Sequence, residues 1–308
     1  MASEHLLEVI LGFIVSDGAE LQEVNSEAML TVAQLDAVFA AAPRLQVLNA
    51  DVTDHCETLL PLLRNGSPYD SRLRFSDLRA LFHRASADVA IAFAAAVAAH
   101  DSLKCVGLYH VLFVPALNAL LDTAAEQRVS IFALTDCRTD ADSVPALARL
   151  LRRGSLTKLH IWCNNFPRAP EESVLDLCRA VRACRTLTYL RFCFNTRPQG
   201  TSARVVAELL DAAAALPALS ELNLDGSIVQ DTVAFGRALG ALLRANLPSL
   251  RTLNVFNCHL GDEGLAPLLD GLAANTHLHE MYCDYNDVSE AFKRNRLAPA
   301  LAALKARR

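Results

Sequence analysis

The sequence lacks the short motifs that mark the commonest classes of enzyme. Its 308 residues contain no glycine-rich phosphate loop, no Gly-x-Ser-x-Gly elbow, no His-Glu-x-x-His pair and no finger-like spacing of Cys and His. Such motifs cradle phosphates, present nucleophiles or ligate metals. We therefore expect that the protein is not an enzyme and that it has no cofactor and no metal site.

Cysteine pairs and positive charge are also scarce. The nine cysteines are odd in number and include no Cys-x-x-Cys pair, which favours reduced thiols and a cytoplasmic, intracellular location. The 34 Asp and Glu residues outnumber the 29 Lys and Arg residues, and the bases form no stripe. We therefore expect no binding to nucleic acid.

The charges are spread unevenly along the chain. Residues 1–60 carry ten acidic side chains against Arg44 alone, whereas residues 285–308 carry six basic and two acidic side chains. Such ends can be simple solvated faces. Alternatively, one end docks a basic partner, or the two ends associate head to tail.

The N-terminal segment is apolar but does not have the features of a membrane or export signal. Residues 3–15 are mainly apolar, yet the segment carries Glu4 and Glu8, has no basic start and is too short to cross a bilayer. We expect a capping helix over residues 1–16 and no membrane association.

What the sequence does contain is a recurring apolar ladder of the form LxxLxLxxN. The six clearest copies read Val129-x-x-Phe132-x-Leu134-x-x-Cys137, Leu156-x-x-Leu159-x-Ile161-x-x-Asn164, Leu187-x-x-Leu190-x-Phe192-x-x-Asn195, Leu219-x-x-Leu222-x-Leu224-x-x-Ser227, Leu250-x-x-Leu253-x-Val255-x-x-Cys258 and Leu278-x-x-Met281-x-Cys283-x-x-Asn286. Four looser copies start near residues 21, 45, 70 and 103, the third with Leu73 and Phe75 as its second and third anchors. The ten starts are about 29 residues apart on average, a period typical of solenoids.

Each ladder is followed by a helical pattern, with apolar residues three and four positions apart, and then by a turn such as Leu216-Pro217 or Leu247-Pro248. A single repeat cannot bury its own apolar side, so neighbouring repeats must share the burial and align their strands in parallel. The pattern predicts an α/β fold: a right-handed β-α solenoid with a parallel sheet on the concave face and helices outside.

We expect one domain over residues 1–308. About ten repeats span residues 17–290, between the N-terminal capping helix and a C-terminal capping helix over residues 291–308. The last helix would use Leu297, Leu301 and Leu304 as its apolar side and end in basic residues, which the helix dipole favours.

The ladders resemble those of leucine-rich-repeat proteins of the ribonuclease-inhibitor-like class. The position that closes the strand turn in that family, Asn or Cys, is matched here by Cys137, Asn164, Asn195, Cys258 and Asn286. It is not matched by Thr53, Leu78, Val111 and Ser227. The resemblance implies a horseshoe of repeats with a full helix in each, and relatives that include ribonuclease inhibitors and Ran GTPase activators.

Function in such a scaffold is expected on the outward side of the strands, because side chains alternate across a strand. The row after the second anchor reads Asn49, Arg74, Gly107, Ala133, His160, Arg191, Asn223, Asn254 and Tyr282. The row after the third anchor reads Asp51, Ser76, Tyr109, Thr135, Trp162, Cys193, Asp225, Phe256 and Asp284.

Aromatic residues are concentrated in these rows, and protein interfaces concentrate aromatic and Arg side chains at their centres. We expect a protein partner to contact Tyr109, His160, Trp162, Tyr189, Arg191, Phe194, Asp225, Phe256, Tyr282, Asp284 and Tyr285. The alternative is that these rings pack against one another or simply favour strands. A metal or thiol site at His160, Cys163 and Cys193 is disfavoured, since His160 does not share a row with Cys193.

Two functions fit this pattern. The first is a monomeric, non-enzymatic scaffold that binds a protein on its concave face. The second is a regulator of an enzyme, for example a GTPase activator or an inhibitor, in which Arg168 and Arg197 reach from the strand-end loops into a bound active site. A further possibility is that the chain is a recognition part whose signalling domain is carried elsewhere.

Overall fold

The computed structural model describes residues 23–41, 47–63, 73–74, 77–99, 103–162, 169–193 and 200–307. The chain forms two compact units, residues 1–129 and residues 130–308, and each is described by itself. The proposed capping helix over residues 1–16 lies outside the described residues. Whether the whole chain acts as one domain stays a prediction.

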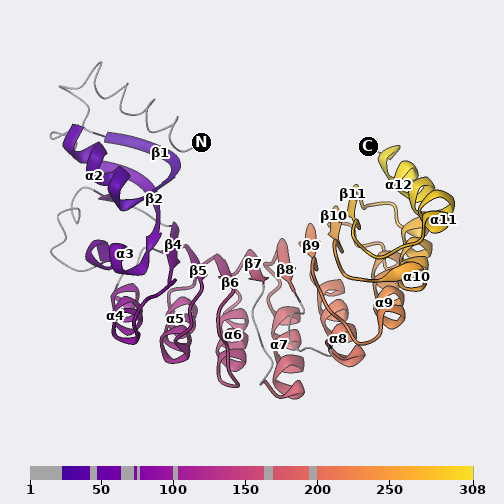
Figure 1. Ribbon diagram of the computed structural model, residues 1–308, viewed down its shortest axis with the longest axis horizontal. Helices are drawn as coiled ribbons and strands as arrows, with labels where there is room; N and C mark the ends of the chain where they lie inside the picture. The colour runs from indigo at the N-terminus through magenta and orange to yellow at the C-terminus, as the bar shows by residue number, and fades with distance from the viewer. Residues whose placement is uncertain are drawn as a thin grey trace. The chain divides into compact units, whose positions relative to one another are not determined.

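The second unit repeats strand, loop and helix along its whole length (Figure 1). Its strands are β6 (Ile131–Thr135), β7 (Lys158–Trp162), β8 (Tyr189–Phe192), β9 (Glu221–Asn223), β10 (Thr252–Asn254) and β11 (Glu280–Tyr282). Its helices are α6 (Ser143–Arg152), α7 (Glu171–Ala183), α8 (Ala203–Ala214), α9 (Thr232–Arg244), α10 (Gly261–Ala274), α11 (Glu290–Phe292), the π-helical turn η1 (Lys293–Leu297) and α12 (Ala298–Lys305).

The strands of this unit pair in parallel and in the register that the ladders predict. The second anchors lie opposite one another from strand to strand: Phe132, Leu159, Leu190, Leu222, Leu253 and Met281. All six are buried, with exposed fractions of 9% or less. The predicted fold class, a parallel β-α solenoid, is confirmed.

Local sequence explains where the helices begin and end. The side chains of Ser202 and Asp231 accept hydrogen bonds from the backbone N–H groups of Val205 and Ala234, which satisfies free donors in the first turns of α8 and α9. Both helices end shortly before the predicted proline turns at Pro217 and Pro248.

The turn position of the ladder is occupied by side chains that hydrogen-bond to the backbone. Asn286 is buried; its Nδ2 donates to the carbonyls of Val255 and Cys283, each at 2.8 Å, and its Oδ1 accepts from the N–H groups of Cys258 and Leu260, each at 3.2 Å. The Cys258 thiol, at the same position one repeat earlier, makes fewer hydrogen bonds: it donates to Leu224 O at 3.1 Å and to Phe256 O at 3.5 Å. Asn and Cys recur here because each satisfies backbone groups of its own turn and of the preceding repeat.

Helices α9 and α10 are in backbone contact. A Cβ atom on Gly236 would lie 1.7 Å from the carbonyl oxygen of Gly264, and one on Gly240 would lie 2.2 Å from that of Pro267. No side chain fits between these helices at either position, so the glycines determine how closely α9 and α10 approach.

The C-terminal helical segment differs in part from the expected capping helix. It consists of α11, η1 and α12, and it buries Leu297 and Leu304, whereas Leu301 is only half-buried. Arg307 does not serve its own helix end: its guanidinium donates to the carbonyls of Leu272 and Asn275 at the end of α10. Arg307 therefore caps the helix of the preceding repeat.

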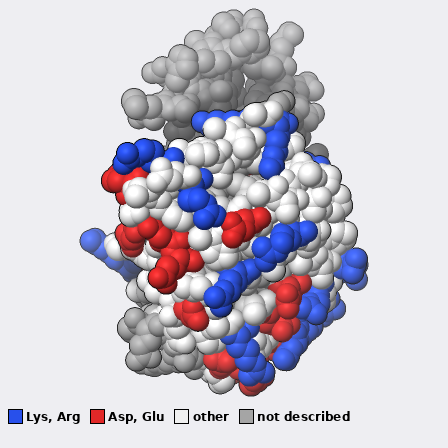
Figure 2. All heavy atoms as spheres, turned by 90° about the vertical axis from the view of Figure 1, so that its right-hand side faces the viewer, with Lys and Arg blue, Asp and Glu red and all other residues white. Residues whose placement is uncertain are grey.

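Basic side chains of this segment are partly neutralised. Lys293 pairs with Glu290 at 2.6 Å, and Arg296 pairs with Asp270 at 2.7 Å. Figure 2 accordingly shows acidic and basic side chains interspersed on the C-terminal side of the second unit.

The first unit has the same alternation with less regular strands. Its elements are β1 (Glu23–Leu30), α2 (Val32–Ala41), β2 (Val47–His55), α3 (Cys56–Leu63), β3 (Leu73–Arg74), β4 (Asp77–Leu81), α4 (Ala87–Ala98), β5 (Cys105–Tyr109) and α5 (Val114–Glu126). No helix in the described ranges combines the length and apolarity that a membrane span requires.

The predicted third ladder is correct in register towards β2 and wrong towards β5. Leu73 is buried and lies in the two-residue strand β3, opposite Leu48 of β2 as the ladders predict. On the other side, β4 pairs with β5 so that Leu78 and Ala80 lie opposite Val106 and Leu108. Leu78 and Ala80 are therefore the anchors that continue into β5, and Arg79 and Leu81 lie opposite Gly107 and Tyr109 in the outward rows. Arg74 lies opposite Asn49 of β2, as predicted, and Ser76 lies outside the described residues.

Candidate functional site

In the described part of the second unit, the helices that follow the strands lie on one face of the sheet only. Figure 1 shows α6–α10 on one side of β6–β11 and the opposite side lined by the strands. Along β7 the burial alternates, with Leu159 and Ile161 buried, His160 and Trp162 half-buried and Lys158 exposed. The residues between the anchors thus point away from the helices, as predicted, and form a partly exposed face.

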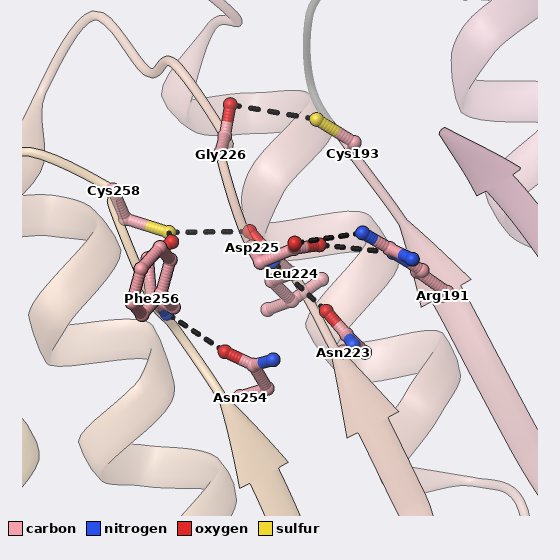
Figure 3. Close-up of polar contacts among 9 residues, drawn as sticks. All are labelled: Arg191, Cys193, Asn223, Leu224, Asp225, Gly226, Asn254, Phe256 and Cys258. Carbon is pink, nitrogen blue, oxygen red and sulfur yellow. Dashed lines mark hydrogen bonds and ion pairs between the residues drawn. The ribbon is translucent and has the colours of Figure 1, made fainter. Parts of the chain in front are cut away.

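At the centre of this face lie Trp162, Arg191 and Asp225, which we name the Trp–Arg–Asp cluster. The Arg191 guanidinium carbon lies 4.8 Å from the centroid of the Trp162 ring. Its Nε and Nη2 donate to the two carboxylate oxygens of Asp225 at 3.0 and 2.7 Å (Figure 3). Both charged side chains are 19% exposed, so the ion pair is shielded but reachable.

His160 lies beside this cluster, opposite Arg191 in the register of β7 and β8. Burial, together with the nearby Arg191 charge, lowers the pKa of its imidazole from 6.5 to about 4, although the Asp225 carboxylate acts in the opposite direction. Its Nε2 atom is buried, and no described residue hydrogen-bonds to it. His160 is therefore a neutral residue at physiological pH.

This shift predicts an acid-sensitive component of stability. As the pH falls from 6.5 towards 4, the unfolded chain binds a proton at His160 that the folded chain does not bind, so the free energy of unfolding decreases. The loss should reach about 2–3 kcal/mol near pH 4 and be absent above pH 6.5. Urea unfolding of the native chain and of His160→Gln across this range measures it. Equal pH slopes for the two chains would contradict it.

A second group of aromatic residues lies at the ends of β10 and β11. Phe256 and Tyr285 have ring centroids 4.9 Å apart, and the Tyr282 hydroxyl donates to Glu280 at 2.9 Å. Phe256, Tyr282 and Tyr285 are 36%, 48% and 72% exposed. Asp284 is also exposed. The rings do pack in part against each other, as the alternative interpretation expects, and they still present large apolar areas to solvent.

Tyr189 lies beside an acidic residue, Glu221, that the sequence interpretation did not include in the site. Burial and the nearby Glu221 carboxylate raise the pKa of the Tyr189 hydroxyl. Glu221 lies opposite Tyr189 in the register, one position before the second anchor of β9. Because this row also points outward, its acidic members Glu221 and Glu280 could have been included on alternation alone.

Two of the predicted site residues are not part of this face as described. Phe194 lies outside the described residues. Tyr109 is the half-buried last residue of β5, in the first unit, where it lies opposite Leu81. Arg168, Arg197 and Cys163, which the alternative functions require, also lie outside the described residues.

Several row members that the alternation predicts to be exposed are buried instead. These are Gly107, Thr135, Cys193 and Asn223. Asn223 Oδ1 accepts from the N–H of Asp225 at 3.1 Å, and Asn254 Oδ1 accepts from that of Phe256 at 2.9 Å. The two asparagines thus act on the backbone and set the direction of the residue that follows the third anchor (Figure 3).

The arrangement offers little for chemistry. Burial raises the pKa of the Cys178, Cys258 and Cys283 thiols to about 12, so they are protonated at neutral pH. Cys193 is buried and donates to Gly226 O at 3.4 Å. Among the described residues, no group of three or more His, Cys, Asp or Glu side chains could hold a metal ion.

The repeated strand and helix, the parallel register and the Asn/Cys turn position together define a β-α solenoid of the leucine-rich-repeat type. No family model matches the chain, and no curated protein matches it.

Three proteins illustrate the similarity of this chain to solved structures. They are leiomodin-1 actin-binding site 2 (18% identity, TM-score 0.38, covering 52% of this chain and 86% of that one), the tropomodulin C-terminal domain of Caenorhabditis elegans (22%, 0.38, 53% and 94%) and a protein from Bacteroides fragilis (14%, 0.48, 79% and 67%). Likeness at this level concerns only the fold and says nothing about what this chain binds.

Proposed function

We propose that this chain is a non-enzymatic, cytoplasmic scaffold of the ribonuclease-inhibitor-like class that binds a protein partner, as a monomer, on its concave sheet face. The observation that carries the proposal is the Trp–Arg–Asp cluster. In it Arg191 lies against Trp162 and is held by both oxygens of Asp225, on a face without covering helices. Eight described cysteines are free thiols, in keeping with a reducing compartment.

The cluster favours binding because its side chains are already ordered. Arginine and tryptophan are the residues most often found at the energetic centres of protein interfaces. An arginine that is free in solution loses rotamer freedom when a partner immobilises it, whereas Arg191 is fixed by two hydrogen bonds and a ring. A partner can therefore bury the cluster at a low entropic cost.

The test is affinity capture from the native cell, with the captured proteins identified by mass spectrometry. The double variant Trp162→Ala/Arg191→Ala should lose the specific partner, with affinity weakened about 100-fold or more, because two central anchors are removed. The matched control is Ile91→Ala/Arg237→Ala, which removes an exposed apolar side chain and an exposed arginine from helices α4 and α9. It should capture the partner normally.

Folding must be measured in parallel, because removing Arg191 leaves the Asp225 carboxylate without its ion pair. Trp162→Ala alone keeps that pair and should still weaken capture about tenfold while its thermal unfolding stays close to that of the native chain. Unchanged capture by both variants would mean that the rings serve only to pack against one another. The proposal would then be wrong.

A further inference from the structure

A second surface on the same sheet face has its own chemistry. It lies on β9–β11 and the turns that follow them, and it consists of Glu221, Phe256, Glu280, Tyr282, Asp284 and Tyr285. We name it the C-terminal patch. It combines three carboxylates with three aromatic rings, and those rings are among the most exposed large apolar side chains in the described part of the chain.

The aromatic part of the patch is ordered. Phe256 and Tyr285 lie 4.9 Å apart at an interplanar angle of 58°, and Tyr282 donates to Glu280 at 2.9 Å. Tyr285 nevertheless has 72% of its surface exposed. The faces of such rings carry negative electrostatic potential, so they attract cations.

Two carboxylates of the patch, those of Glu221 and Glu280, are close enough to affect one another. Glu221 on β9 and Glu280 on β11 are in register with Thr252 on β10, the strand between them. Burial raises the pKa of the Glu221 carboxyl, and the Glu280 charge raises it further. The outward positions of the described strands β9–β11 hold no lysine or arginine. Lys158 and Arg191, on β7 and β8, act in the opposite direction on the pKa of Glu221, and Arg191 is also paired with Asp225.

The ligand that these residues fit is an organic cation and not a metal ion. The described carboxylates do not converge into a group that could hold a metal. Glu221 and Glu280 are separated by β10 and therefore lie roughly two strand spacings, about 10 Å, apart, a distance that an extended chain covers in about three residues. This suits an extended segment that carries several cationic side chains. A lysine or arginine side chain can also place its charge over a ring while its methylene groups contact the apolar surface.

This inference rests on the proposed function and specifies the partner. We propose that the C-terminal patch binds an extended, lysine- or arginine-containing segment of the protein partner, with the cationic side chains between the rings of Tyr282 and Tyr285 and the carboxylates of Glu221, Glu280 and Asp284. The Trp–Arg–Asp cluster would then bind a different, apolar or acidic, part of the same partner.

The experiment uses the full chain and labelled peptides of alternating Lys and Gly, with matched peptides of alternating Glu and Gly. We expect fluorescence anisotropy to show binding of the Lys peptide, weaker binding at high salt, and no binding of the Glu peptide. The triple variant Glu221→Gln/Glu280→Gln/Asp284→Asn should weaken binding about tenfold or more. Tyr285→Ala should weaken it about threefold while leaving the charge unchanged.

The control must remove the same net charge elsewhere. Glu171→Gln/Asp211→Asn/Glu263→Gln takes three carboxylates from helices α7, α8 and α10, on the other side of the sheet, and should bind the Lys peptide as the native chain does. If both triple variants weakened binding equally, the Lys peptide would be attracted by the net charge of the chain and not by the C-terminal patch, and the inference would be wrong. So would equal binding of the Lys and Glu peptides.

Two further outcomes are informative. If the chain self-associates, and the patch variant abolishes this, the occupant is a second copy and not a partner segment, and the inference as stated is wrong. If the captured partner depends on Trp162 and Arg191 but not on the patch carboxylates, the proposed function stands and only this inference fails. Loss of partner binding in the patch variant, with normal thermal unfolding, would support it.

Discussion

Gly236→Ala is expected to destabilise the C-terminal repeats strongly although it adds a single methyl group. The new Cβ would lie 1.7 Å from the carbonyl oxygen of Gly264, so α9 and α10 must separate before both can fit. Overpacking of this kind costs about 1–3 kcal/mol, whereas alanine gains about 1 kcal/mol in helix propensity over glycine. Because the obstacle is backbone, we expect the overpacking cost to lie at the upper end of that range and the net loss to be about 2 kcal/mol.

Urea unfolding and hydrogen exchange of α9 and α10 would measure this loss. Arg237→Ala, at the exposed neighbouring position of the same helix, is the control and should change stability by less than about 0.5 kcal/mol. In a solenoid each repeat contacts only its neighbours, so exchange should increase first in α9, α10 and the segment beyond them. A Gly236→Ala chain as stable as the native one would show that the two helices can separate freely.

The repeat pattern could be predicted from the sequence wherever the apolar anchors were unambiguous. From Val129 onward each ladder offers only one set of residues that can be buried together, so period and register follow from burial alone. Near residue 75 two sets compete, Leu73 with Phe75 and Leu78 with Ala80. Both alternate correctly, and β2 pairs with strands from both sets, so only the pairing with β5 selects Leu78 and Ala80. Local sequence cannot contain that information.

The candidate site could be predicted as a row of positions but not as a set of contacts. Alternation placed Trp162, Arg191 and Asp225 on the outward face, and it could not show that Arg191 bonds to Asp225 and lies against Trp162. It also failed where a side chain turns back to the backbone. Asn223 and Cys193 are at outward positions but are buried. Asn223 accepts a hydrogen bond from the turn after its own strand, and Cys193 donates one to the turn after the strand of the next repeat.

Asn286→Ala is expected to have the second large effect, through lost hydrogen bonds and not through packing. The side chain is 1% exposed and satisfies two carbonyls and two N–H groups of the turns after β10 and β11. Each buried backbone group left without a partner costs about 1–3 kcal/mol unless water enters. We expect a loss of about 3 kcal/mol in the free energy of unfolding, measured by urea unfolding.

The neighbouring repeat provides the comparison. Cys258 occupies the equivalent turn position, but its thiol is a weak donor, so Cys258→Ala should cost only about 1 kcal/mol. Asn286→Asp keeps the shape and the acceptor oxygen while directing a carboxylate oxygen at the carbonyls of Val255 and Cys283. It should therefore be at least as damaging as alanine at neutral pH. If Asn286→Asp were tolerated, or if the two alanine variants cost the same, the position would be filling space and not satisfying the backbone. The recurrence of Asn and Cys in these ladders would then need another explanation.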